Sequence, residues 1–326
     1  DDQVFPAAVR VREGTATLTD CVLGSQDGVG LSVGGDAARA VARDCRFEGC
    51  RVNGVRSVSG ARVELASCRF GVSSTAIIAK RGSAITLQDC EVSGPLIGLY
   101  ADEDSELSGK RVAINGTRTA ACAVHSKATM RFEELTVDAQ KGYGVRCFDG
   151  GSIELIRSRI TAGSGGVFVR DGTLLLRELT VRSSGGSGIS VRRGRVEGRQ
   201  LVARACARHG LEARLAIVVL HGVDIRDCKL SGVLGDRKSY VFLANGTISG
   251  CGGDGVTGSG LTRLDLDHLE LIGNGGYGFR QGPGAMCWTC DLTARDNKAG
   301  DWEVKGARAN MSGGKLTPKP PKTLPK

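Results

Sequence analysis

The chain contains 326 residues, among them 49 Gly, 7 Pro and only 14 aromatic residues (2 Trp, 4 Tyr and 8 Phe). Its 40% apolar content supports an extended core and argues against disorder over most of the length. A membrane-spanning helix is excluded because the longest apolar run, Leu215 to Leu220, is far shorter than the roughly 18 residues that a span needs. Collagen is excluded because glycine does not recur at every third position. The 44 Lys and Arg residues exceed the 35 Asp and Glu residues, which gives a net charge of +9.

A glycine-marked pattern repeats about every 22 residues, irregularly near 15–23 and 30–47 and regularly from residue 54 onward. Each row begins with a short strand of the type Gly-apolar-x-apolar, passes a Gly or charged turn, and continues with alternating apolar positions. A third short strand ends the row, as at 179–181. About fourteen rows fit the chain, the last beginning near Asp301. The regular rows begin at Gly54, Ala76, Gly98, Ala120, Gly144, Gly166, Gly188, Gly210, Gly232, Gly255 and Gly278.

A period of this length indicates a repeat architecture. Helical arrays are excluded because the rows carry several glycines and a two-residue alternation instead of a 3.6-residue period. Propeller blades need about 40 residues, and leucine-rich repeats need an order of Leu with Asn or Cys that these rows lack. Over roughly residues 9 to 305, the rows resemble the coils of a right-handed parallel β-helix of the pectate-lyase-like superfold. The resemblance implies an all-β solenoid with three short strands per coil, and it matches no specific enzyme family.

The repeat predicts one domain at 1–315, with regular coils at about 54–300 and capping segments at both ends. The Pro- and Lys-rich segment 316–326 is expected to be a flexible tail or linker. The chain begins at Asp1 without a basic and apolar leader, which is typical of a processed or trimmed product.

The 12 cysteines recur at fixed row positions and predict ladders of buried thiols that act as small hydrophobic side chains. Disulfides between neighbouring coils are the alternative, because a coil spacing of about 4.8 Å lies within the Cα range that a disulfide allows. One set contains Cys21, Cys45, Cys68, Cys90 and Cys290, and the other contains Cys50, Cys206, Cys228 and Cys251. The only CxxC pair, Cys287 and Cys290, has no second ligand pair at a zinc-site spacing, so no metal site is predicted.

A dense basic region predicts a positive flank on adjacent coils, and it contains Arg192, Arg193, Arg195, Arg199, Arg204, Arg208 and Arg214. The candidate binding residues lie at the turns that follow the first strand of each row, and they are Lys80, Arg81, Arg170, Arg192, Arg193 and Arg214. Such a flank would hold an acidic polysaccharide or another protein by charge, and the alternative is an ordinary basic surface. Nucleic acid is disfavoured as a partner because aromatic stacking platforms are nearly missing.

The resemblance implies that chemistry, where it occurs, lies on the outer face of the first strand and its following turn. The candidate catalytic residues at that place are Asp102, Asp104, His125 and Asp149. Paired carboxylates would hydrolyse a glycosidic bond, or would hold Ca²⁺ while Arg or Lys removes the proton beside a uronate carboxyl group. A solvated ladder of charges is the alternative. Segments typical of polygalacturonases, pectate lyases and mannuronan epimerases are absent from the sequence.

We therefore expect a non-catalytic, surface- or envelope-associated binding or scaffold protein that presents a basic face to an anionic partner such as an acidic polysaccharide. One alternative is a polysaccharide lyase or glycoside hydrolase of the same superfold, and another is a structural spacer or self-assembling rod. No cofactor is expected, and Ca²⁺ enters only under the lyase alternative. The expected location is extracellular or in the cell envelope.

Overall fold

The computed structural model describes residues 5–183, 185–304 and 309–312, the last segment as backbone only. Within these ranges the chain forms 36 strands and no α-helix, and it therefore offers no helix with the length and apolarity for a membrane crossing. The predicted tail at 316–326 lies outside the described residues. The structure divides into two compact units, one ending at Thr180 and one beginning at Val181, which are described separately.

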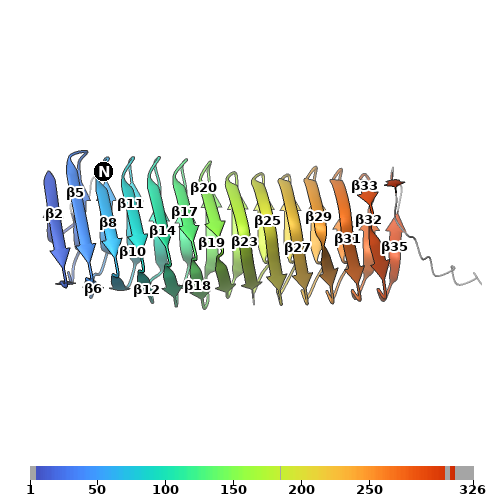
Figure 1. Ribbon diagram of the computed structural model, residues 1–326, viewed down its shortest axis with the longest axis horizontal. Helices are drawn as coiled ribbons and strands as arrows, with labels where there is room; N and C mark the ends of the chain where they lie inside the picture. The colour runs from blue at the N-terminus through green and yellow to red at the C-terminus, as the bar shows by residue number, and fades with distance from the viewer. Residues whose placement is uncertain (1–4, 184, 305–308, 313–326) are drawn as a thin grey trace, which may run out of the picture. The chain divides into compact units, whose positions relative to one another are not determined.

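In the first unit, one strand from each coil adds to a parallel sheet, here called the first sheet (Figure 1). Its members in pairing order are β1 (Ala7–Val11), β4 (Val29–Gly34), β7 (Asn53–Val58), β10 (Thr75–Lys80), β13 (Ile97–Ala101), β16 (Ala120–Val124), β19 (Tyr143–Phe148) and β22 (Gly165–Arg170).

The other two pieces of each coil form the second sheet. The longer pieces are β2 (Gly14–Thr19), β5 (Ala38–Arg43), β8 (Arg62–Ala66), β11 (Ala84–Gln88), β14 (Glu106–Lys110), β17 (Thr129–Glu133), β20 (Ser152–Ile156) and β23 (Thr173–Ser183). The shorter pieces are β3 (Val22–Leu23), β6 (Arg46–Glu48), β9 (Arg69–Gly71), β12 (Glu91–Ser93), β15 (Ala113–Asn115), β18 (Thr136–Ala139) and β21 (Arg159–Ala162).

The second unit repeats the plan, but the two second-sheet pieces of most coils run on as one ten-residue strand. Its first-sheet strands are β24 (Ile189–Arg192), β26 (Leu211–Arg214), β28 (Val233–Asp236), β30 (Val256–Gly258), β32 (Tyr277–Gln281) and β35 (Gly300–Val304). Its second-sheet strands are β25 (Arg195–Arg204), β27 (Ile217–Arg226), β29 (Tyr240–Ser249), β31 (Arg263–Ile272), β33 (Met286–Cys290), β34 (Thr293–Arg295) and β36 (Ala309–Ser312).

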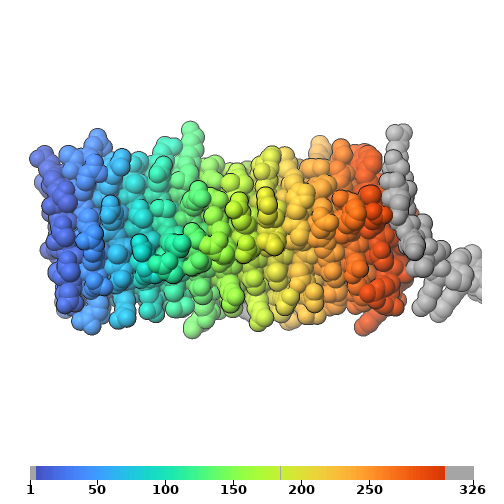
Figure 2. Space-filling view, in the orientation of Figure 1, coloured from blue at the N-terminus to red at the C-terminus, as the bar shows by residue number. Residues whose placement is uncertain are grey.

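The strand pairing confirms the predicted parallel solenoid. The two units together contain about 13 turns with a repeat of about 23 residues, close to the fourteen rows of about 22 residues read from the sequence. Within each unit, Figure 2 shows the coils as narrow bands that follow one another in sequence order. The boundaries predicted for a single domain stay a prediction.

The core consists of inward side chains that stack on their counterparts in the next coil. Val55, Ile77 and Leu99 are in register on β7, β10 and β13, and all three are fully buried. The rings of Phe47 and Phe70 stack with centroids 4.6 Å apart and planes 3° apart. Parallel stacking of like residues explains why so few aromatic residues suffice.

The row-marking glycines are required by close packing between the sheets. At Gly144, an added Cβ would lie 2.2 Å from Ile160 Cγ2 and 2.6 Å from the Gly166 carbonyl oxygen. The sharp corner between the two second-sheet strands of a coil is formed by residues other than glycine. In the first unit it holds one left-handed residue per coil, with φ of 47° to 60°, at Asp20, Asp44, Ser67, Asp89, Arg111, Glu134, Arg157 and Glu178.

The cysteines are all free thiols, and ten of the twelve are buried. The Cys68 thiol donates to the Ala42 and Ala66 carbonyl oxygens. In the second unit, the thiols of Cys206, Cys228 and Cys251 each donate to the carbonyl oxygen two residues earlier. Cys290 is exposed and pairs with Asp267 on β31, so its assignment to the first cysteine set is wrong. Leu292, two residues later and fully buried, continues the inward column instead.

Candidate functional site

The outward side chains of β10, β13, β16, β19 and β22 gather on one face of the first unit. Leu99 and Ala101 point into the core, so the pleat directs Tyr100 and the following Asp102 outward. In-register pairing carries this column from Tyr100 through Ala123 and Arg146 to Phe168. We call this surface the aromatic–arginine face, and it consists of Lys80, Tyr100, Asp102, His125, Tyr143, Arg146, Phe148, Phe168 and Arg170.

At one end of the face, Asp102 joins three neighbouring groups. Lys80 Nζ lies 3.3 Å from Asp102 Oδ2, and the Tyr100 hydroxyl donates to the same oxygen over 3.0 Å. The Lys80 ammonium also lies 5.5 Å from the Tyr100 ring centroid. Burial raises the pKa of Asp102, but hydrogen bonds from Ser126 and Tyr100 and the charge of Lys80 outweigh it, so the pKa is lowered. Asp102 is therefore ionised at neutral pH.

Tyr100 and His125 occupy the middle of the face. Burial, together with the Asp102 charge, raises the pKa of Tyr100, so its hydroxyl stays a proton donor. The His125 ring lies 5.5 Å from the Tyr100 ring and 4.8 Å from the Phe148 ring. Burial lowers the pKa of His125 although Asp102 and Asp149 oppose the shift, so the imidazole is neutral at pH 7.

At the other end, two guanidinium groups lie against one ring. The Arg146 and Arg170 guanidinium carbons are 4.7 and 4.9 Å from the Phe148 centroid. Phe148 itself is only 3% exposed, because the two guanidinium groups pack on its ring and cover it. Arg146 Nε is buried without a hydrogen-bond acceptor, and no carboxylate in the described residues pairs with Arg146. Arg170 Nε lies 4.0 Å from Asp171 Oδ2, so the charge that stays without an acidic partner at this end is that of Arg146.

The catalytic candidates do not all converge. Asp102, His125 and Asp149 lie on three adjacent coils, with Asp149 Oδ2 3.7 Å from His125 Nδ1. Asp104 is exposed in the turn that follows β13. Within the described residues, no hydrogen bond or ion pair links its carboxylate to Asp102, His125 or Asp149. Arg81 points to another partner, since its Nε lies 3.2 Å from Glu103 Oε2.

The predicted basic residues fall into separate environments. Lys80 and Arg170 belong to the aromatic–arginine face. In the second unit, Arg192 on β24 is in register with Arg214 on β26. Arg214 Nε lies 3.0 Å from Glu212 Oε1 and 3.9 Å from Asp236 Oδ2. These carboxylates neutralise Arg214, which leaves less positive charge there than the sequence suggested.

Aromatic residues gather on this surface, although Phe148 is too deeply buried to serve as an exposed stacking platform. Four of the 14 aromatic residues, Tyr100, Tyr143, Phe148 and Phe168, lie on it. A row alignment places Phe148 beside His125 and Arg170, so the signal was present in the sequence. Among the described residues, no group of three His, Cys, Asp or Glu side chains is arranged to hold a metal ion.

Comparison with known proteins agrees with the fold. A family model described as a right-handed β-helix region matches residues 7–160. The chain is a right-handed parallel β-helix. A search of curated proteins finds no match to its sequence.

Two solved structures share this β-helix. Vag8, solved in complex with C1 inhibitor, has a TM-score of 0.62 and 11% identity, with 91% of this chain and 88% of that chain covered. The periplasmic alginate epimerase AlgG has a TM-score of 0.53 and 9% identity, with 84% of this chain and 76% of that chain covered. At these identities the likeness concerns the fold, and function must be argued from the residues of the site.

Proposed function

We propose that the protein binds an acidic polysaccharide along the aromatic–arginine face without cleaving it. The observation that carries the proposal is the pair of guanidinium groups, Arg146 and Arg170, held on the Phe148 ring. Guanidinium groups bind carboxylates in a planar, bidentate manner, and their preorganisation on a ring reduces the entropy lost on binding. They lie on the adjacent strands β19 and β22 but two residues apart in register, because Arg146 pairs with Phe168 and Arg170 pairs with Phe148. This diagonal arrangement suits two charges of an extended polymer that crosses the strands obliquely.

The partly exposed rings of Tyr100, Tyr143 and Phe168 support the same ligand class, since they offer apolar surface next to the cations. Because polysaccharides of this kind lie outside cells, the proposal includes an extracellular or cell-envelope location. Detection of the protein in the envelope and secreted fractions of the organism that makes it tests that part.

The test of binding is retention on immobilised polygalacturonate and alginate, with dextran as a neutral polymer. The double variant Arg146→Gln, Arg170→Gln should lose most of the retention, and the salt dependence of what is left should become shallower. Arg39→Gln, Arg43→Gln on the outer side of β5 removes the same charge elsewhere and is the matched control. Equal retention of the two double variants, or equal retention on dextran, would overturn the proposal.

A second candidate function is a polysaccharide lyase or hydrolase. It is favoured by the neutral His125, a potential proton acceptor, between Asp149 and the Lys80–Asp102–Tyr100 group. A screen for new reducing ends and unsaturated uronates over plant, algal and bacterial polysaccharides tests it. Product formation that His125→Gln abolishes would establish this candidate, and the absence of product across the panel would remove it.

A further inference from the structure

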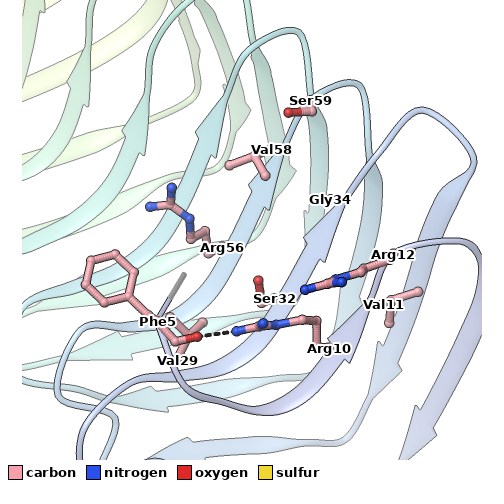
Figure 3. Close-up of a pocket in the computed structure, with 10 residues that line it drawn as sticks. All are labelled: Phe5, Arg10, Val11, Arg12, Val29, Ser32, Gly34, Arg56, Val58 and Ser59. Carbon is pink, nitrogen blue, oxygen red and sulfur yellow. Dashed lines mark hydrogen bonds between the residues drawn. The ribbon is translucent and has the colours of Figure 1, made fainter. Parts of the chain in front are cut away.

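A hollow lies on the outer side of the first sheet at the start of the chain (Figure 3). It has a volume of about 280 Å³ and is formed by β1, β4, β7 and the segment that contains Phe5. Three of its ten lining residues, Arg10, Arg12 and Arg56, are arginines, and none is acidic. The remaining lining residues are small, apolar or hydroxyl-bearing.

The strand register explains how the arginines surround the hollow. Arg10, Ser32 and Arg56 are in register on β1, β4 and β7, so Ser32 lies between two arginines, each about 4.8 Å away along the sheet. The adjacent lining residue Gly34 has no side chain, which leaves space beside Ser32. Figure 3 shows the guanidinium ends of Arg10 and Arg12 directed toward Ser32, with Arg56 on the other side near Phe5.

Local contacts hold two of these side chains in place. Arg10 donates a hydrogen bond to the Phe5 carbonyl oxygen, and the Arg56 guanidinium lies 5.6 Å from the Phe5 ring centroid. Neither Arg10 nor Arg12 forms an ion pair within the described residues. Among the described residues, the hollow therefore combines the charges of Arg10 and Arg12, which have no acidic partner there, with an apolar wall of Phe5 and Val58.

We propose that this hollow binds a sugar ring that carries a sulfate ester or a phosphate monoester. A planar carboxylate offers two oxygens and is satisfied by one bidentate arginine, whereas a tetrahedral oxyanion with three terminal oxygens accepts donors from several directions. The guanidinium groups and the Ser32 hydroxyl approach from different strands, which suits the tetrahedral group. The volume lies at the small end of ligand pockets, so it suits one substituted ring and not a chain segment. The hollow adjoins the aromatic–arginine face, since Val58 is in register with Lys80, but it shares no residue with that face and does not depend on polymer binding there.

The test is isothermal titration of the whole chain with glucose 6-sulfate, glucose 6-phosphate, glucuronate and glucose. Glucose 6-sulfate or glucose 6-phosphate should bind at least ten times more tightly than glucuronate, and glucose should not bind measurably. Whichever of the two esters binds more tightly identifies the source, sulfated or phosphorylated saccharide. Equal affinity for glucuronate, or no binding of either ester, would overturn the proposal.

Variants locate the binding and separate it from the proposed function. Arg12→Gln and Ser32→Leu should each weaken ester binding at least fivefold, the first by loss of charge and the second by filling the hollow. The Arg39→Gln, Arg43→Gln protein should bind as the unaltered chain does. The Arg146→Gln, Arg170→Gln protein should keep ester binding while it loses retention on polygalacturonate. Ester binding that survives both Arg12→Gln and Ser32→Leu in folded protein would show that the hollow is not the site.

Discussion

The Arg146 guanidinium carbon lies 4.7 Å from the centre of the Phe148 ring, two residues further along β19. Ordinary alternation would direct both side chains outward to solvent, yet Phe148 is 3% exposed because Arg146 and Arg170 cover it. The contact therefore has two roles: it buries the Phe148 ring, and it places two guanidinium groups on the surface above that ring.

Replacement of Phe148 by Leu should separate these two roles. The smaller side chain keeps most of the buried apolar area but removes the ring face that orients the arginines, so we expect a loss of about 1 kcal/mol in the free energy of unfolding. Retention on polygalacturonate should fall several-fold although the net charge is unchanged. Urea unfolding and affinity chromatography measure the two effects. Full retention by this variant would show that the ring does not organise the cations.

Asp102 should contribute more to stability than its exposed neighbour Glu103. Asp102→Asn removes the charge that pairs with Lys80 and weakens the acceptor of the Tyr100 hydroxyl. Both partners would stay in a partly buried place, so we expect a loss of about 1–3 kcal/mol. Glu103→Gln is the matched control, because its ion pair with Arg81 is solvent-exposed and is worth less than about 1 kcal/mol. Chemical unfolding of the two variants should therefore give clearly different midpoints, and equal midpoints would contradict the assigned role of Asp102.

The repeat could be predicted from the sequence because stacking makes every coil obey the same steric rules. A glycine recurs where the two sheets approach closely, as at Gly144, and apolar residues recur where side chains stack. The register then follows, since a slip of one residue would expose the core. The misassigned Cys290 shows the limit of this prediction. Cys290 and Leu292 are two residues apart and both are suited to the inward column, so the sequence pattern alone does not show which of them occupies it.

The site was predicted only in part, and for a physical reason. Charged turn residues such as Asp102 and His125 stand out in aligned rows, but their partners Tyr100 and Arg146 sit within strands that resemble ordinary strand sequence. Whether Arg214 is a free cation or a neutralised one depends on Glu212 and Asp236, whose distances no row alignment gives. The structure therefore shows which charges are paired between neighbouring coils, and this cannot be predicted from the sequence.

The pH dependence of stability should contain a contribution from His125. Burial lowers its pKa in the folded protein, so the unfolded chain binds the proton at a higher pH than the folded one does. The unfolded state then holds more protons in the window below the usual histidine pKa of about 6.5, and the free energy of unfolding falls as the pH decreases. His125→Gln lacks this contribution, so its stability should fall less between about pH 7 and pH 5. Urea unfolding at both values measures the difference, and parallel decreases would contradict the burial of His125.

In the second unit, Asn274 should be among the most sensitive polar positions. It is fully buried and continues the column of Cys206, Cys228 and Cys251. Its side-chain oxygen accepts from the Cys251 amide over 3.0 Å, and its Nδ2 donates to the Ile248 carbonyl and to Asn297 Oδ1. Asn274→Ala leaves these buried groups unpaired, so we expect a loss of about 2–4 kcal/mol in the free energy of unfolding. Asn115→Ala, at a partly exposed strand end, should change stability by less than about 0.5 kcal/mol. Similar unfolding curves for the two alanine variants would show that the Asn274 hydrogen bonds do not stabilise these coils.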